Sequence, residues 1–258
     1  MATVKALILR APGTNCDDET AFAFEKAGAS AEKIHVTALL ERPARLAEAN
    51  VLALPGGFSY GDDLGAGKVL SLQIRESLLP AIREFVRKGG LVIGICNGFQ
   101  ILVKCGLLPG GVDAPSDPTA TLGWNDSHKF ESRWVLLAPG NSPSPFLEGL
   151  GHVEMPVAHG EGKFIPKDEA LLESIRKGRQ IAFRYASRGG GTPAYPENPN
   201  GSADDIAGIT DPSGRILGLM PHPERNVLPW HHPRWTKEGL QAEGAGLAIF
   251  KNAVRHFA

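Results

Sequence analysis

The chain has 258 residues, 42% of them hydrophobic, and its 27 basic and 28 acidic side chains give a net charge of −1. This is enough apolar sequence for a substantial core in one large α/β domain or two small ones. Because basic and acidic residues are interspersed, we expect neither a nucleic-acid nor a membrane surface, since both need a local excess of Lys and Arg.

Short apolar runs alternate with helical patterns up to residue 110. Acidic residues at the start and Gly28 near the end indicate a helix over 18–29. A longer helical stretch over 68–90 is interrupted near Pro80 and stopped by two glycines, and a further helix is expected over 98–106. The apolar runs predict strands at 4–9, 33–39, 50–55 and 91–95. Uninterrupted apolar strands between helices indicate a mostly parallel central sheet that is flanked by helices on both faces.

The pattern changes after Pro109, where strand-like segments are joined mostly by turns. We expect this second half to be antiparallel and to pack on or beside the first sheet. Its strands are predicted at 130–138, 152–160, 180–186, 205–211 and 215–222, and a last helix at 246–257. The Gly/Pro/Asn-rich segment 186–202 is the best candidate for a mobile loop. With no internal repeat and no long linker, we predict a single domain over residues 1–258.

The three cysteines, Cys16, Cys96 and Cys105, form an odd set without paired spacing. This favours free thiols in a reducing cytoplasm over a disulfide framework. The first 13 residues are interrupted too soon, by Arg10 and Pro12, for a signal peptide or a spanning helix. No group of Cys and His has the spacing of a zinc site, so we expect no metal site in this chain.

The segment LVIGICNGFQILVKCG, residues 91–106, places Cys96 between an apolar strand and a helix. Gly94 and Gly98 flank it in a G-x-C-x-G pattern, whose mechanism is similar to that of the serine elbow of α/β hydrolases. The positive end of the following helix favours the reactive thiolate, and the backbone N–H of Asn97 would face an oxyanion on a substrate carbonyl. Cys96 is therefore a candidate nucleophile, and the alternative is a small buried core residue.

A thiolate nucleophile needs a base, and the base needs an orienting group. His222 ends the apolar run RILGLM in the turn Pro221-His222-Pro223-Glu224, which the prolines stiffen. Glu224 can reach the imidazole across this turn, hold its tautomer and stabilise the imidazolium. The alternative is a surface histidine in a polar turn, and the pairing with the elbow argues against it.

The loop LPGGFSYGDDLGAG, residues 54–67, contains a third candidate feature. Gly56 and Gly57 follow a strand at its carboxyl end, where open α/β sheets place their ligands. Backbone N–H groups there could complete an oxyanion hole, and the alternative is an ordinary tight turn. The loop is not a phosphate-binding loop, because it lacks the Walker and G-x-G-x-x-G patterns.

In this order, PGGFSYGD, GICNGFQIL, PVAHGEGKF and MPHPER resemble the class I, or triad, glutamine amidotransferases over nearly the whole chain. More narrowly, they are similar to the branch of that family that serves de novo purine (IMP) synthesis. The resemblance implies a flavodoxin-like α/β fold with a Cys-His-Glu triad. It gives Cys96 the role of nucleophile, His222 that of base and Glu224 that of orienting acid. The backbones of Gly57 and Asn97 match the oxyanion-hole donors.

The resemblance also implies a set of glutamine-binding residues. Gln100, four residues after the nucleophile, matches the glutamine-contacting residue of the C-x-G-x-Q pattern. Gly56 and Phe58 come with the PGGF loop. His159, Gly160 and Glu161 match a loop that borders the glutamine pocket, although this HGEG segment could equally serve partner docking.

The activity implied is hydrolysis of glutamine through a glutamyl thioester, with the ammonia passed to a second active site. The chain contains no ATP-binding motif, so the resemblance implies that ATP and Mg are used by a separate large synthetase subunit. A small bridging subunit in the same complex is left open. No cofactor is expected in this chain itself.

Three other interpretations stay open. The glutaminase could feed a different acceptor synthetase, or the chain could be a cysteine peptidase or DJ-1-like hydrolase, which lack the PHPE turn and the GGFSYGD loop. A non-catalytic binding subunit is disfavoured because all three triad positions are filled. The segments 186–202 and 226–244 look longer than the connections of shorter family members. They are either insertions packed on the body or contacts to a synthetase subunit.

Overall fold

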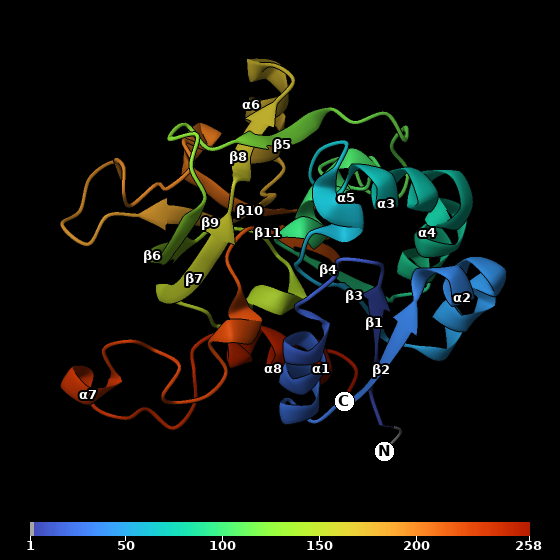
Figure 1. Cartoon of the computed structure of the whole chain (residues 1–258), viewed down its shortest axis with the longest axis horizontal. Helices are drawn as coiled ribbons and strands as arrows, with labels where there is room; N and C mark the ends of the chain where they lie inside the picture. Colours follow the sequence, from blue (N-terminus) through green and yellow to red (C-terminus); the bar gives the residue numbers. More distant parts are fainter. Residues whose placement is uncertain (1–2) are drawn as a thin grey trace.

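A nine-stranded sheet crosses the computed structural model, which describes residues 3–258 (Figure 1). Its first five strands are mutually parallel, and the other four continue the sheet antiparallel. In spatial order the strands are β2 (Ser30–His35), β1 (Lys5–Arg10), β3 (Val51–Leu54), β4 (Leu91–Ile95), β11 (Ile216–Leu219), β10 (Ile206–Thr210), β9 (Ile181–Ala186), β6 (Glu131–Pro139) and β7 (Val153–His159). The expected mixed sheet, parallel in the first half and antiparallel in the second, is confirmed.

Helices cover both faces of the parallel part, which explains why its central strands are apolar throughout. Every residue of β3 and β4 is buried. Helices α1 (Asp17–Lys26) and α8 (Leu247–Arg255) lie together on one side (Figure 1). The rings of Phe24 and Phe250 meet edge to face between them, with their centroids 5.0 Å apart. Helices α3 (Lys68–Gln73) and α5 (Asn97–Lys104) lie on the other side. Strands that are buried from both faces cannot show an alternating pattern.

Two expected elements are divided in the structure. The strand expected over 33–39 stops at His35, whose ring nitrogen accepts a hydrogen bond from the N–H of Thr37 at 3.3 Å and caps helix α2 (Val36–Glu41). The long helical stretch contains α3, a π-helical turn η3 (Ile74–Leu78) and α4 (Leu79–Arg87), with Pro80 in the first turn of α4. The interruption near Pro80 is confirmed, because the π-helical turn ends at Leu78 and a new α-helix begins at Leu79. Proline is tolerated in the first turn of that helix.

Several elements lie outside the predicted segments. Strands β5 (Ala120–Trp124) and β8 (Glu161–Pro166) form a separate two-stranded sheet, and α6 (Glu169–Lys177) follows β8. The remaining elements are short helical turns. They are η1 (Pro43–Glu48), η2 (Ser59–Asp62), η4 (Pro145–Leu147), η5 (Ala203–Asp205), η6 (Pro223–Arg225) and α7 (Trp235–Glu238).

The last strand differs from the expectation for the second half. Instead of joining the antiparallel part only, β11 inserts beside β4 and runs parallel to it, with Leu219 opposite Ile95. Gly218 makes this possible, because a Cβ there would lie 2.1 Å from the ring of Phe99 on α5. The consequence is that β4 and β11 end side by side at the same edge of the sheet.

The Gly/Pro/Asn-rich segment is only partly free of contacts. Residues 188–192 are exposed, but Asn198 and Asn200 are buried. The side-chain amide of Asn200 donates to the Gly162 carbonyl and to the Tyr185 hydroxyl, both at 2.9 Å. The end of the segment is therefore fixed to the body, contrary to a loop that is mobile along its whole length.

Among residues 3–258, none of the helices has the length and apolar character that would let it cross a membrane. The first two residues of the N-terminal segment considered above lie outside the described residues. The expectation of a single domain over 1–258 stays a prediction.

Replacing Gly218 with Ala tests the packing of β11 against α5. The added methyl group would overlap Phe99 and the Leu108 side chain, which lies 2.7 Å from its position. We expect Gly218→Ala to lower the free energy of unfolding by about 1–3 kcal/mol in urea denaturation, as for other overpacked cores. Gly151→Ala is the control, because its Cβ would meet nothing within 4 Å. Equal stability of the two variants would contradict the packing argument.

Candidate functional site

The site forms where four neighbouring parallel strands end. Strand β3 pairs with β4 through Leu54 and Gly94, and β4 pairs with β11 through Ile95 and Leu219, so their following loops start at one edge. Carboxyl ends of parallel strands are where open α/β sheets place ligands. The loops after β1, β3, β4 and β11 bring together Cys16, Gly56 and Gly57, Cys96, and His222 with Glu224.

Cys96 occupies a strained corner between β4 and α5. Its φ of 52° lies in the left-handed region that non-glycine residues rarely adopt. The flanking glycines are required by space, since a Cβ on Gly98 would lie 1.9 Å from the Leu54 carbonyl oxygen. The Cys96 N–H donates to the Leu219 carbonyl at 2.8 Å, and its Sγ lies 3.6 Å from the Ala158 carbonyl oxygen. The structure thus contains the elbow that the sequence predicts.

His222 and Glu224 form a buried pair beside this corner. The Nδ1 of His222 lies 2.5 Å from a carboxylate oxygen of Glu224, and both residues are 1% exposed. Burial alone would lower the pKa of His222, but the negative charge of Glu224, with that of a Cys96 thiolate, raises the pKa well above its usual value. The other ring nitrogen, Nε2, makes no hydrogen bond within the described chain. It is therefore available to a reacting group.

A second cysteine reaches the same imidazole. The Cys16 sulfur, a ring nitrogen of His222 and a carboxylate oxygen of Glu224 all lie within 4.8 Å of one another. Only Cys96, however, borders the cavity of about 650 Å³ that opens beside the elbow. No elbow surrounds Cys16 in the sequence, so its place at the triad was not predicted.

The large cavity collects most of the residues expected to bind substrate. Gly57, Phe58, Gln100, His159, Gly160 and Glu161 all line it. Gly56 lies instead beneath the triad, where a Cβ would be 2.8 Å from the His222 ring and 3.1 Å from the Cys16 sulfur. Sequence reasoning did not name the other polar and aromatic residues of the lining, which include Asp62, Asp63, Trp124, His128, Lys129 and Phe130.

The side chains of Asn97 and Gln100 tie the cavity walls together. The Asn97 amide donates to Gln100 at 2.9 Å and to Asp62 at 3.1 Å, and its oxygen accepts from the Ser59 N–H at 3.2 Å. The Gln100 amide donates to the Glu161 carbonyl at 2.5 Å. The backbone N–H of Asn97 is at the first position of α5, where helical N–H groups have no partner within their own helix.

The N–H of Gly57 is also outside the local backbone pairing. Its loop is joined to the loop after β1 by the hydrogen bonds Asn15 N–H to Gly56 at 3.4 Å and Phe58 N–H to Gly13 at 2.9 Å. Gly57 itself has a φ of 147°, and a Cβ there would lie 2.8 Å from three backbone atoms. The two expected oxyanion donors, Gly57 and Asn97, therefore both stand at the edge that carries Cys96.

His159 is a neutral wall of the cavity. Burial, with the charge of His222 as a smaller cause, lowers its pKa to about 3. Its Nδ1 lies 3.0 Å from the side-chain oxygen of Asn125, which also accepts from the Gly162 N–H at 3.1 Å. Asn125 is fully buried and fixes the β7–β8 corner, a role for which the sequence gives no signal.

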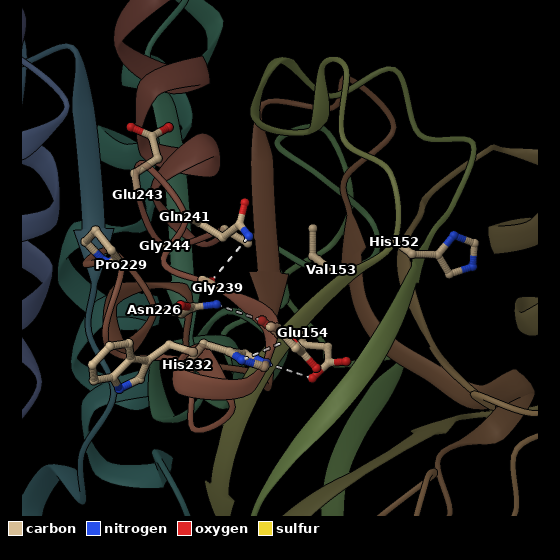
Figure 2. Close-up of a pocket in the computed structure, with 13 residues that line it drawn as sticks. His152, Val153, Glu154, Asn226, Pro229, His232, Gly239, Gln241, Glu243 and Gly244 are labelled. Atoms are coloured by element: carbon tan, nitrogen blue, oxygen red, sulfur yellow. Dashed lines mark hydrogen bonds and ion pairs between the residues drawn. The ribbon is translucent and has the colours of Figure 1, made fainter.

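The segment 226–244 is fastened to the body around Glu154 (Figure 2). The carboxylate of Glu154 accepts from His232 and Arg234 at 2.9 Å each and from Arg188. Burial would raise the pKa of Glu154, but the hydrogen bonds from Arg188, His232 and Arg234 outweigh it and hold the pKa at about 2. His232 also packs edge to face on Trp134 at 5.0 Å. This arrangement favours a packed insertion, with a cavity of about 360 Å³ beneath it.

The Glu154 cluster predicts a pH-dependent contribution to stability. Because the pKa of this carboxyl is lower in the folded state than its usual value near 4.3, its contribution is present above that pH and is lost as the pH falls toward 2. We expect Glu154→Gln to lower the free energy of unfolding by about 1 kcal/mol at pH 7, after allowing for solvent screening. The difference from the parent should shrink below about pH 4.

Urea denaturation between pH 3 and 7 measures this difference. Glu76→Gln is the matched control, since Glu76 pairs with Arg75 but its side chain is 70% exposed. A Glu154→Gln effect that stays constant over this pH range would contradict the assignment.

Comparisons with known proteins agree with this geometry. Residues 3–257 match the family described as the CobB/CobQ-like glutamine amidotransferase domain. The phosphoribosylformylglycinamidine synthase subunit PurQ of Dehalococcoides mccartyi is 51% identical over 256 residues, covering 99% of this chain and 98% of that protein. PurQ of Methanococcus maripaludis is 38% identical over 266 residues, covering 98% and 97%.

Solved structures show the same similarity. A chain in the structure of PurLQS from Thermotoga maritima superposes with a TM-score of 0.75 at 30% identity, and the match covers 100% of both chains. A glutamine amidotransferase from Thermotoga maritima superposes with a TM-score of 0.52 at 20% identity, which indicates a shared fold.

Proposed function

Because this chain belongs to the CobB/CobQ-like glutamine amidotransferases, among the PurQ subunits of phosphoribosylformylglycinamidine synthase, we propose that it hydrolyses glutamine to glutamate and ammonia through Cys96, His222 and Glu224. The observation that carries the proposal is the convergence of these residues beside one cavity of about 650 Å³. The match over residues 3–257 and the PurQ relatives confirm the family expected from the sequence motifs.

In the first step, the Cys96 thiolate attacks the side-chain carbonyl carbon of glutamine and a carbon–sulfur bond forms. The carbon–nitrogen bond then breaks, and the His222 imidazolium donates its proton to the departing nitrogen, which leaves as ammonia. The raised pKa of His222 keeps that proton on the ring at neutral pH. Glu224, at Nδ1, fixes the ring so that Nε2 faces the reaction.

In the second step, water attacks the glutamyl thioester. Neutral His222 takes a proton from the water, glutamate leaves, and the Cys96 thiolate is restored beside the imidazolium. In both steps a tetrahedral oxyanion forms, and the backbone N–H groups of Gly57 and Asn97 stabilise it. By analogy with serine enzymes each such donor contributes about 3 kcal/mol.

We assign recognition of the substrate to the cavity wall. Phe58, Gln100 and the His159-Gly160-Glu161 corner line the space next to Cys96 and supply apolar, amide and carboxylate surfaces. Gly56 contributes by leaving room for the triad rather than by direct contact. Because the pKa of His159 is depressed, its ring offers no positive charge to the substrate.

Ammonia released in water is protonated and lost, so a second active site must capture it. We propose a complex like the PurLQS assembly named for the Thermotoga maritima relative, in which a large synthetase subunit uses ATP and Mg to convert formylglycinamide ribonucleotide to formylglycinamidine ribonucleotide. Exposed aromatic side chains at the cavity mouth, Phe58, Trp124 and Phe130, support a partner surface there. We also propose that the chain itself holds no cofactor and works in the cytoplasm.

Replacing Cys96 with Ala tests the nucleophile. In the complex with the synthetase subunits, ATP, Mg and the ribonucleotide, we expect Cys96→Ala to lose glutamine-dependent product formation by at least about 1,000-fold. Formation of product from added ammonium salts should persist, because the synthetase site is unchanged. Glutamine-dependent activity in Cys96→Ala would contradict the proposal. If Cys96→Ala keeps this activity while a Cys16 variant loses it, Cys16 is the nucleophile.

Glutamine hydrolysis by the isolated chain should be weak. His222 Nε2 makes no hydrogen bond within residues 3–258, and the sulfur of Cys96 contacts the Ala158 carbonyl instead. We expect the synthetase subunits to raise the rate by about 10-fold or more, since small misplacements of reacting groups cost that much. Turnover of glutamine with and without the partner measures the effect, and equal rates would contradict this prediction.

A further inference from the structure

A second, smaller cavity lies against the triad and contains groups that the proposed reaction does not use. It has a volume of about 270 Å³ and shares Cys96, Gly57, Phe58, Phe130 and Ala158 with the larger cavity. The rest of its lining is polar or sulfur-bearing, with His222 at one wall. These further residues are Asn15, Cys16, Ser132 and Arg225.

Cys16 is held in this cavity from several directions. Its N–H donates to the Gly56 carbonyl at 3.2 Å, and the side chain is only 1% exposed. The guanidinium of Arg225 donates to its sulfur at 3.0 Å, and the thiol donates to the side-chain oxygen of Asn15 at 3.2 Å. A sulfur with both a charged donor and an acceptor is fixed in position rather than merely buried.

The fixed sulfur lies beside the imidazole. It is within 4.8 Å of a ring nitrogen of His222 and of a carboxylate oxygen of Glu224. Gly56 lies between the sulfur and the imidazole. A Cβ at this position would lie 2.8 Å from the His222 Cε1 and 3.1 Å from the Cys16 sulfur, so only glycine leaves room for both groups. Glu224 holds the ring through a hydrogen bond at Nδ1, and a fixed sulfur on another side of the ring opposes tilting about that bond.

We propose that Cys16, fixed by Arg225, is a positioning residue for glutamine hydrolysis that holds the His222 imidazole toward Cys96. This inference rests on the proposed function of the same site. Arg225 directly follows Glu224, so one turn supplies both the acid that orients the ring and the cation that anchors the sulfur. The Arg225–Cys16 contact joins residues that are 209 positions apart, and it connects the loop after β1 to the turn after β11.

The charged and titratable groups that face His222 set its response to the loss of Cys16. Burial lowers the pKa of His222, and Glu224, Cys96 and Cys16 raise it. Removing the Cys16 sulfur therefore lowers the pKa of the ring, and the imidazolium that protonates ammonia is lost at a lower pH. The titratable and charged side chains around the ring are Glu224, Cys96, Cys16, His159 and Arg225.

The test uses the complex with its synthetase subunits and measures glutamine-dependent kcat and KM from pH 6 to 10. We expect Cys16→Ala to lower kcat by about 10–100-fold, as for a displaced catalytic group, with KM changed by less than about 2-fold. The alkaline limb of the profile should move to lower pH. Cys16→Ser should recover most of kcat, since its hydroxyl keeps a polar contact. Cys105→Ala is the matched control for loss of a buried thiol away from the site, and it should retain the parent profile.

Parent-like kcat and pH profile in Cys16→Ala would overturn the proposal, as would an equal loss of kcat in Cys105→Ala. If Cys16→Ala does not fold, Arg225→Gln decides in its place: by freeing the Cys16 sulfur it should lower kcat by about 10-fold or more with KM changed by less than about 2-fold, and a parent-like kcat would overturn the proposal. Cys96→Ala in the same assay keeps the two ideas apart. If it retains glutamine-dependent activity, the proposed function fails; if it is inactive while Cys16→Ala is unchanged, only the positioning role fails.

Discussion

The parallel pairing of β11 with β4 is the constraint on which the site depends. It places the turn that carries His222, at the end of β11, directly beside the elbow that carries Cys96, at the end of β4. No other strand lies between β4 and β11. The Cys96 N–H donates to the carbonyl of Leu219, the last residue of β11, so the strained corner is itself held by the neighbouring strand. A cysteine in this backbone conformation costs free energy, and the surrounding sheet keeps it there.

The glycines around this edge are required because there is no space for a side chain, not because the backbone must be flexible. At Gly56, Gly94 and Gly98, a side chain would enter space that the triad, the elbow helix or a strand carbonyl already occupies. Three loops and one helix can approach closely here because these glycines have no Cβ atoms. The same arrangement leaves His222 and Glu224 almost without solvent contact, which makes their hydrogen bond and opposite charges strong enough to outweigh burial.

Local sequence patterns predicted the parts of the molecule that depend on neighbours in the chain. The elbow at Cys96 and the turn at His222 each lie within a short motif, and the buried strands β3 and β4 are continuous apolar runs. What could not be predicted depends on distant partners. The parallel placement of β11, the burial of Asn125 and the contact of Arg225 with Cys16 join segments far apart in sequence, and no local pattern records such pairing. Helix α2 was missed because a single His35 cap overrides a strand-like composition.

Two buried imidazoles lie close to the elbow, and their electrostatics are opposite. His222 faces a carboxylate and holds a proton, whereas His159 faces the amide of Asn125 and stays neutral down to about pH 3. Only one of them can exchange a proton with a reacting group near neutral pH. Proton transfer at Cys96 is thereby assigned to His222, and the His159 ring can touch a substrate without taking part in its acid–base chemistry.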